Sequence, residues 1–260
     1  MRYLIGSKFY NLNTPTSDKD YIQFVFPTKD DLFKANFTSK QTKNENGDDV
    51  VVKDIRLLLK GLKKGSLQIF EVLYSEPIED INKSNFFWLY GYFKLYRNRL
   101  FEEQKGELLK AIQGELTNRY KKFQSENTVK GYVNCCKLVY LFYAIHFNSE
   151  NPFELIMNQD NETKYLFEQY KKLRVNCNSF KDINDYVDRK EQLVKCFNDI
   201  KSEIIKTNEQ KPTVESFAKE HKQGTYILSV AGHLTVCKDG KYIDSWDCGS
   251  KSLYGYWEVK

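Results

Sequence analysis

Gly6-Ser7-Lys8-Phe9-Tyr10-Asn11-Leu12-Asn13-Thr14-Pro15-Thr16-Ser17-Asp18-Lys19-Asp20 is the stretch that decides the fold of the amino-terminal part of this chain. Residues 1–5 before it are largely apolar, which predicts a short strand that enters the Gly6-Ser7 turn. Residues 21–26 after it are rich in β-branched and aromatic side chains and stop at a proline, which predicts a second, buried strand. The sequence thus puts a glycine turn and two carboxylates between two strands.

The residue types in this stretch suit the binding of a phosphate and a cation. Glycine lets backbone N–H groups approach an anion closely, and Ser7 adds a hydroxyl donor. Side chains alternate along a strand, so Asp18 and Asp20 are expected on one face and Lys19 on the other. Neighbouring carboxylates repel each other unless a cation lies between them, and Mg²⁺ prefers oxygen ligands. Taken singly, the same residues also fit a plain turn followed by a solvated loop.

The whole stretch resembles the G-S-x(9)-S-D-x-D signature of the DNA polymerase β-like nucleotidyltransferase superfamily, above all its predicted bacterial and phage branch. Residues 10–12 (Tyr-Asn-Leu) and 14–15 (Thr-Pro) fill the places that this branch usually gives to those residue types. The similarity continues through residues 49–56 and 70–73, and more loosely to about residue 208. The resemblance implies an α+β fold built on a minimal polymerase β-like sheet.

What the resemblance implies is Mg²⁺-dependent transfer of a nucleoside monophosphate from an NTP to a hydroxyl group. The acceptor class stays open between RNA or tRNA, a small molecule and a protein. Gly6 and Ser7 would hold the triphosphate, with Ser17 as a further nucleotide-binding residue, while Asp18 and Asp20 would bind the metal. A catalytically inactive relative that binds nucleotide or RNA is the first alternative.

A third carboxylate is expected on a neighbouring strand, where the family uses it to act on the acceptor hydroxyl and on the metal. Asp49 is chosen because it starts the apolar strand of residues 50–52, and Asp48 and Asp54 are its rivals. Lys137 falls where similar proteins often have a basic residue that faces the cleft. It is the candidate for a phosphate contact from the helical part of the chain.

Composition restricts the remaining classes. The chain has 260 residues, of which 41% are hydrophobic and 15% aromatic, which indicates a folded globular protein. Its net charge of +5 permits a nucleotide or nucleic-acid partner without demanding one. No apolar run reaches the roughly 18 residues of a membrane helix, so a cytoplasmic protein of a bacterium or phage-infected host is expected. The six cysteines form no C-x-x-C pair, which argues against a zinc or dithiol site.

Three regions are expected along the chain: the catalytic core at 1–80, a helical region at 81–208 and a small β-rich module at 209–260. The polar stretch 38–47 is interpreted as a mobile loop between strands of the core. In the helical region, the aromatic residues of 90–99 recur at helical spacing and are interpreted mainly as core.

The β-rich module shows its own pattern of local signals. A helix is expected to start at about 212–217 with Thr213 near its cap, and strands are expected at 224–230, 232–236, 242–246 and 253–257. The Asp239-Gly240 pair is typical of a hairpin turn. Together these signals predict a small antiparallel meander.

This module resembles the His-bearing half of papain-like cysteine peptidase domains found in phage proteins. The resemblance implies that His233 acts as a base and that Asp244 orients it. A peptidase or transferase of this kind also needs a cysteine at the start of a buried helix. Cys135 or Cys136 would supply it, which makes a papain-like enzyme a further alternative.

Overall fold

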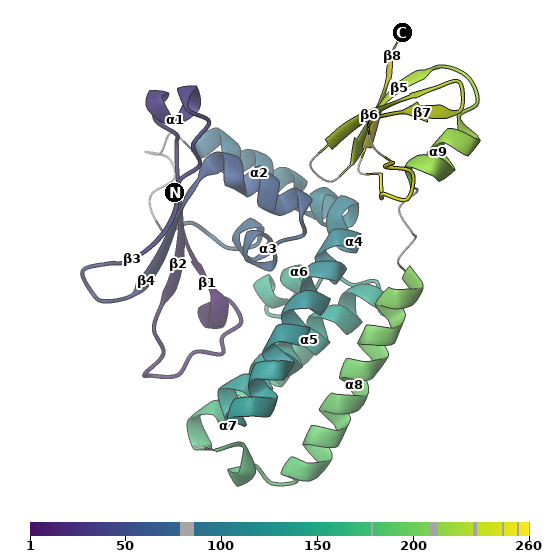
Figure 1. Cartoon of the computed structure of the whole chain (residues 1–260). Helices are drawn as coiled ribbons and strands as arrows, with labels where there is room; N and C mark the ends of the chain where they lie inside the picture. The colour runs from purple at the N-terminus through teal and green to yellow at the C-terminus, as the bar shows by residue number, and fades with distance from the viewer. Residues whose placement is uncertain are drawn as a thin grey trace. The chain divides into compact units, whose positions relative to one another are not determined.

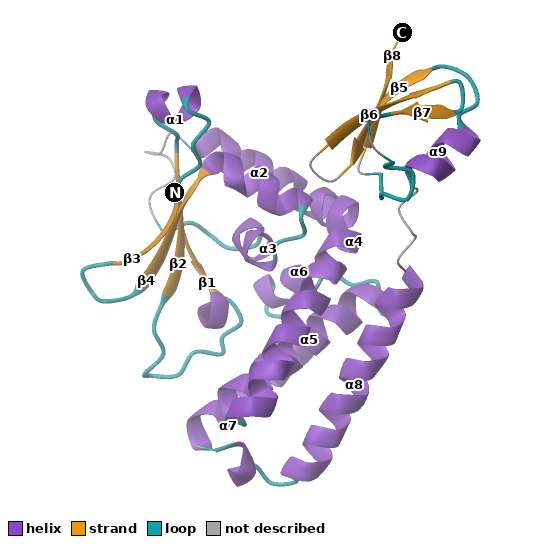
Figure 2. Ribbon diagram, in the orientation of Figure 1, coloured by secondary structure: helices purple, strands orange, loops and turns teal. Residues whose placement is uncertain are grey.

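The computed structural model describes residues 1–78, 86–177, 179–207, 213–230, 233–245, 247–253 and 255–259. The expected α+β class is confirmed, since the chain combines many helices with two small sheets (Figure 1 and Figure 2). The chain divides into two compact units, Met1–Lys201 and Ser202–Lys260. The expected sheet region and helical region therefore belong to one unit.

The first unit contains a four-stranded sheet with the strand order β1-β2-β4-β3. Strand β1 (Arg2–Ile5) pairs antiparallel with β2 (Asp20–Val25), which pairs parallel with β4 (Asp49–Asp54). Strand β3 (Ser39–Lys43) forms the far edge, antiparallel to β4. The two strands expected on either side of the Gly6-Ser7 turn are therefore confirmed.

The expectation of a loop at residues 38–47 is wrong for its first half, because residues 39–43 form β3. All five residues of β3 are exposed, and its sequence, Ser-Lys-Gln-Thr-Lys, has no apolar alternation. Hydrogen bonds from the backbone of β4 hold this strand, and such bonds leave no trace in side-chain pattern. Charged edge strands of this kind also protect a sheet against pairing with other chains.

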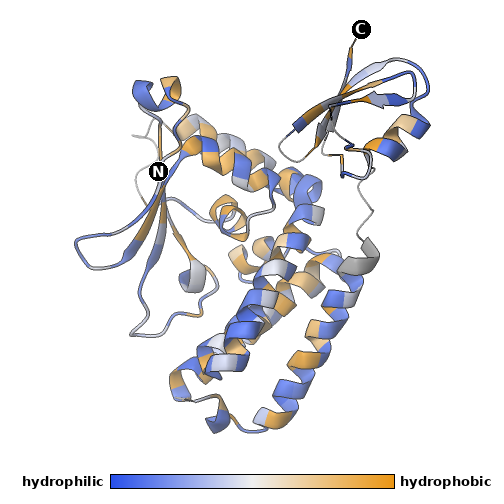
Figure 3. Cartoon of the chain, viewed as in Figure 1, coloured by the Kyte–Doolittle hydropathy of each residue, from blue (hydrophilic) through white to orange (hydrophobic). Residues whose placement is uncertain are grey.

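Two short helices lie on one face of this sheet (Figure 1). Helix α2 (Ile55–Lys63) follows β4 directly and contacts β2 and β4, while α3 (Leu67–Leu73) contacts β1. Residues 69–73 of α3 are all buried, and Figure 3 shows this helix as largely hydrophobic. The exception within that buried run is Glu71, an acidic residue with only 3% of its surface exposed.

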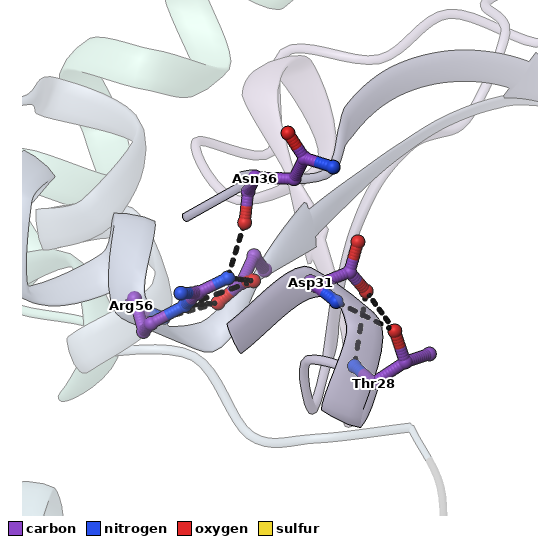
Figure 4. Close-up of polar contacts among 5 residues, drawn as sticks. Thr28, Asp31, Asn36 and Arg56 are labelled. Carbon is purple, nitrogen blue, oxygen red and sulfur yellow. Dashed lines mark hydrogen bonds and ion pairs between the residues drawn. The ribbon is translucent and has the colours of Figure 1, made fainter. Parts of the chain in front are cut away.

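Asp54 joins the end of β4 to the start of α2. Its Oδ1 accepts a hydrogen bond from the Arg56 backbone N–H at 2.8 Å, and its Oδ2 pairs with the Arg56 guanidinium at 2.6 Å. The same guanidinium donates to the Asn36 carbonyl (Figure 4). Asp54 is thus a helix cap and a buried ion-pair partner at the opposite end of β4 from Asp49.

Helices make up most of the described part of residues 81–208, the region expected to be helical. The longest of them, α4 (Phe87–Glu126), buries Leu108, Ile112 and Leu116 at four-residue spacing. The interpretation of the 90–99 aromatics as core is correct for Phe93 but wrong for Tyr92, which is 52% exposed. The other helices are α1 (Lys29–Phe33), α5 (Val129–His146), α6 (Pro152–Met157), α7 (Asn161–Asn176), the 3-10 turn η3 (Phe180–Asp182) and α8 (Tyr186–Thr207), of which residues 202–207 belong to the second unit.

The second unit packs one helix against a four-stranded antiparallel sheet of order β7-β6-β5-β8. Thr213 caps its helix as expected, since Thr213 Oγ1 accepts a hydrogen bond from the Ser216 N–H at 3.1 Å. The core beneath the helix includes Phe217, Leu228 and Cys237. The elements are α9 (Val214–Glu220), β5 (Thr225–Val230), β6 (His233–Lys238), β7 (Lys241–Ile243) and β8 (Gly255–Val259).

The expected meander is wrong in its last step. In a meander β8 would pair with β7, but here β8 pairs with β5, at the opposite edge of the sheet from β7. The segment after β7 is held instead at the start of α9, where Val214 N donates to Lys251 O and Glu215 N donates to Gly249 O, both at 3.0 Å. These bonds carry the chain across to the other edge of the sheet. Gly232, Trp246 and Tyr254, which belong to the expected strands, lie outside the described residues.

Two further expectations concern the whole chain. Across the ranges that the structure describes, no helix combines the length and the apolar character needed to cross a membrane. All six cysteines are free thiols, at positions 135, 136, 177, 196, 237 and 248.

Candidate active site

The Gly6-Ser7 turn follows β1 as the short 3-10 turn η1 (Gly6–Lys8). Gly6 has a φ of +66°, a left-handed conformation that residues with a side chain rarely adopt. A Cβ at this position would lie 2.8 Å from Asp20 Oδ2, so the missing side chain makes room for that carboxylate. The Gly6 N–H donates to Glu71 Oε2 at 3.0 Å, which ties the turn to α3.

Asp20 and Asp49 are register partners on the parallel strands β2 and β4. Partner positions share one face of a sheet, so the two carboxylates are neighbours. Burial raises the pKa of Asp20, and the negative charge of Asp49 raises this pKa further. The charge of Asp18 acts in the same direction, against the opposing charges of Lys130 and Lys137. The two neighbouring carboxylates therefore favour the binding of a proton or a cation.

Asp18 lies in the loop before β2 and is exposed, because the strand begins at Asp20. The expectation that both residues project from one face of a strand is therefore wrong. The cause is a turn over residues 14–17, in which Ser17 N donates to Thr14 O at 3.0 Å and Thr14 N donates to Ser17 Oγ at 2.9 Å. The Ser17 hydroxyl, expected to contact a nucleotide, is engaged in this turn.

Of the three residues considered for the third carboxylate, Asp49 is the one that pairs in register with Asp20. Its Oδ1 lies 3.7 Å from Lys43 Nζ of the edge strand. Asp48 belongs to the preceding turn, where its Oδ2 accepts a hydrogen bond from Asn44 Nδ2 at 3.0 Å. The Asp54 carboxylate caps the start of α2 and pairs with Arg56.

Lys137 of α5, the candidate for a phosphate contact, lies against Tyr10 of the loop that follows η1. Its Nζ lies 4.2 Å from the centroid of the Tyr10 ring. Burial lowers the pKa of Lys137, while the negative charge of Glu71 raises it. For the acidic Glu71, burial has the opposite effect and raises the pKa. The charge of Lys137 and the hydrogen bond from the Gly6 N–H counteract that rise. Glu71 thus holds Gly6 through its N–H, and the charges of Glu71 and Lys137 act on each other.

Lys130 of α5 also acts on Asp20, although no motif in the sequence marks it. It lies seven residues before Lys137, about two helical turns away on the same face of α5. Its positive charge lowers the pKa of Asp20 more than that of Lys137 does. The i, i+7 spacing of the two lysines is the signal that points to both. The charges of both lysines thus act on the Asp20 carboxylate, and ammonium groups are donors for phosphate oxygens.

Helix α7 holds the loop that follows the turn. Lys171 Nζ donates to Asn11 Oδ1 at 3.1 Å, and the Arg174 guanidinium donates to the Leu12 carbonyl. Within the loop, Leu12 N donates to Ser7 O at 2.7 Å. These contacts give the helical region a positioning role for the motif, although the residues involved lie about 160 positions apart in the sequence.

The donor set around Asp20 fits a magnesium ion as part of a nucleotide complex. No group of three or more His, Cys, Asp or Glu side chains in the described ranges is placed to hold a metal ion. Magnesium at nucleotide sites, however, is held by one or two carboxylates together with substrate phosphates and water. Asp20 and Asp49 are the two carboxylates that would hold such an ion, and a cation between them would relieve the repulsion that raises the pKa of Asp20.

The second unit brings His233 and Asp244 together. His233 Nε2 lies 2.6 Å from Asp244 Oδ2, and the Asp244 side chain is 5% exposed. Burial alone would raise the pKa of Asp244, but hydrogen bonds from His233 and from the Ser245 N–H outweigh burial and hold this pKa well below its usual range. Cys248 Sγ also donates to Asp244 Oδ2, at 3.5 Å. The pair is a buried, hydrogen-bonded carboxylate with its histidine.

The cysteines considered as partners for this pair lack the properties of a nucleophile. Cys135 and Cys136 are both buried in the first unit, and burial raises the pKa of each thiol to about 12. Burial also raises the pKa of Cys248. Catalytic thiols need a lowered pKa, because the thiolate is the attacking species.

Acid is expected to destabilise the second unit through Asp244. A carboxyl group whose pKa is lower in the folded state stabilises the fold above its unfolded pKa of about 4, and this stability is lost as the pH falls toward the folded value. We expect amide NMR signals of β5–β8 in the full chain to disperse less as the pH falls from about 5 to 2. Asp244→Asn should weaken the unit at neutral pH and flatten this dependence. An identical acid response in wild type and variant would contradict the assignment.

Two comparisons with known proteins were negative. A scan against protein-family models finds no match, and a search of curated proteins finds no similar sequence.

Proposed function

We propose that this chain is a Mg²⁺-dependent nucleotidyltransferase that moves a nucleoside monophosphate from an NTP to a hydroxyl acceptor. The observation that carries the proposal is the register pair Asp20–Asp49, set against a glycine turn that a side chain at Gly6 would close. Support comes also from the sequence motif of residues 6–20 and from Lys130 and Lys137 of α5, whose positive charges lower the pKa of Asp20.

The residues have separate roles in the proposed reaction. The Gly6-Ser7 turn and the lysines Lys130 and Lys137 bind the triphosphate oxygens, and bound Mg²⁺ offsets the negative charge that builds up on the phosphates. The acceptor oxygen attacks the α-phosphorus, and the bond from that phosphorus to the β-bridging oxygen breaks, so that pyrophosphate leaves. Asp49 takes the proton of the acceptor hydroxyl.

Incubation of the purified chain with each α-³²P-labelled NTP and a cell lysate tests the proposal. We expect label to move from one or more NTPs to a macromolecule or small molecule when Mg²⁺ is present, and to remain on the NTP in EDTA. Ribonuclease and protease treatment of the product then identifies the acceptor class. Nucleotide binding without transfer under all conditions would favour the inactive binding relative and contradict the proposal.

Iodoacetamide treatment separates this function from a papain-like enzyme. If the chain is a nucleotidyltransferase, alkylation of exposed thiols should leave label transfer intact, because the proposed reaction uses no cysteine. Loss of all activity on alkylation of a single cysteine, with the Asp20 variant still active, would favour the thiol enzyme instead.

Gly6→Ala is expected to reduce transfer far more than stability. The left-handed φ costs about 1–2 kcal/mol with any side chain, and the new Cβ, 2.8 Å from Asp20 Oδ2, also displaces the carboxylate. Gly47→Ala is a matched control, because Gly47 has a φ of +81° and a Cβ added there would meet nothing within 4 Å. Both variants should unfold at slightly lower urea concentration, and only Gly6→Ala should lose transfer. Equal activity of the two would contradict this role of Gly6.

A further inference from the structure

A cavity of about 800 Å³ lies in the first unit between α5, α7 and α8. Its walls are one stripe from each helix, at spacings of three and four residues, together with residues 182–184 before α8, which include the carboxylate of Asp182. The α5 stripe includes Tyr132, Cys136, Tyr140 and Tyr143, and the α8 stripe includes Arg189, Leu193 and Cys196. A cavity of this size is in the usual range for small-molecule sites.

The stripes around the cavity differ from the helix faces that form the core. The core face of α5 is apolar and fully buried, as at Val133, Leu141 and Phe142. The cavity face of the same helix carries tyrosine hydroxyls and a thiol. Helix α8 does pack closely elsewhere, because the Phe197 ring stacks on Tyr120 at 4.4 Å. The space is therefore a local feature of the polar stripes and not a general separation of α8 from its neighbours.

Arg189 brings positive charge to the wall of the cavity. Its Nε donates to the Asn184 carbonyl at 3.3 Å, and no carboxylate of the described residues forms an ion pair with its guanidinium. Burial raises the pKa of Tyr132 and of Tyr170. A hydrogen bond from Arg189 and the Arg189 charge counteract that rise in Tyr132, and the charge alone counteracts it in Tyr170. The guanidinium thus lies close to the tyrosines inside the site, and of its five N–H groups those not used by Asn184 and Tyr132 can bind an anion.

Three kinds of group therefore meet in one cavity. Tyrosine rings offer faces on which a planar base stacks. Side-chain amides offer donors and acceptors for the edges of such a base. Arg189, with Lys172 at the same cavity, offers positive charge for a phosphate. The amides are those of Gln169, Asn176, Asn184 and Gln192.

We propose that the cavity between α5, α7 and α8 is a binding site for a nucleoside monophosphate, separate from the Asp20–Asp49 pair. The base stacks on the tyrosines and the phosphate binds Arg189. Adjacent residues of α5 serve the two places, because Lys137 faces the Tyr10 ring while Cys136 lines the cavity. The site does not depend on the proposed transfer reaction.

Titration calorimetry of the full chain with AMP, in EDTA to remove metal-dependent binding, tests this site. We expect saturable binding that Arg189→Gln weakens about tenfold or more, because a charge-assisted hydrogen bond to phosphate is lost. Adenosine, which has no phosphate, should bind wild type and Arg189→Gln equally. Lys190→Gln is the matched control: it removes the same charge from the next position of α8, which does not line this cavity, and it should leave AMP binding unchanged.

A variant that fills the cavity distinguishes a blocked binding site from loss of binding caused by unfolding. Gln192 is exposed on α8 at the cavity wall, so Gln192→Trp should abolish AMP binding while thermal unfolding stays at the wild-type temperature. Asp20→Asn should bind AMP as wild type does, which separates this site from the carboxylate pair. The proposal is overturned by the absence of AMP binding up to about 1 mM, by equal affinities of Arg189→Gln and Lys190→Gln, or by undiminished binding to Gln192→Trp.

Discussion

Asp20→Asn is expected to lower label transfer from an α-³²P-labelled NTP by about a thousandfold, because it removes the proposed metal ligand, and such a ligand is worth several kcal/mol of transition-state stabilisation. The fold should survive the change, since asparagine has nearly the shape of aspartate. Stability should even rise slightly, because the repulsion that raises the pKa of Asp20 beside Asp49 disappears. Initial rates at saturating Mg²⁺ and the urea midpoint of the same variant measure both effects.

Asp48→Asn is the matched control for this loss of charge. Asp48 is adjacent to Asp49 in the sequence, but its carboxylate is bonded to Asn44 in the turn before β4. It should therefore keep the transfer rate of wild type. Comparable loss of rate in the Asp20 and Asp48 variants would mean that negative charge in this region, and not the register pair, matters for transfer.

Gly65→Ala is expected to destabilise the first unit by about 3 kcal/mol, the largest effect on stability that we predict. Gly65 connects α2 to α3 with a φ of +62°, and a Cβ there would lie 2.2 Å from the Glu107 carbonyl carbon and 2.3 Å from Leu108 N. Both atoms belong to the backbone of α4, which cannot rotate away. Left-handed strain and overpacking add in the same direction. The urea midpoint, followed by helical circular dichroism, measures the loss.

Gly106→Ala, one position before Glu107 on α4, gives the opposite expectation. A Cβ at Gly106 meets nothing within 4 Å, and alanine is favoured over glycine within a helix by about 1 kcal/mol. The midpoint should stay the same or rise. A Gly65→Ala protein as stable as Gly106→Ala would show that α2, α3 and α4 do not pack as described.

The sequence predicted those strands, turns and helix caps that depend on residues close together in the chain. The apolar residues 1–5 and the β-branched run 21–26 correspond to β1 and β2, and Thr213 caps α9 as expected. The Asp239-Gly240 turn joins β6 and β7. Asp49, chosen because an apolar strand begins there, is the register partner of Asp20.

Features that depend on long-range contacts were missed. Strand β3 is held by the backbone of β4, and β8 is set beside β5 by bonds between α9 and the segment after β7. The exposed position of Asp18 follows from a turn whose side-chain bonds no periodicity reports. The approach of Lys130 to Asp20 and the cavity between α5, α7 and α8 arise from helix packing, which sequence spacing alone does not fix.

The most direct test of the central claim is anomalous scattering from crystals soaked with Mn²⁺ and a non-hydrolysable NTP analogue. We predict a manganese peak about 2.1 Å from carboxylate oxygens of both Asp20 and Asp49, with the triphosphate running over the Gly6-Ser7 turn toward Lys130 and Lys137. A triphosphate bound elsewhere, or Asp20 and Asp49 without a metal between them while the analogue is bound, would contradict the account.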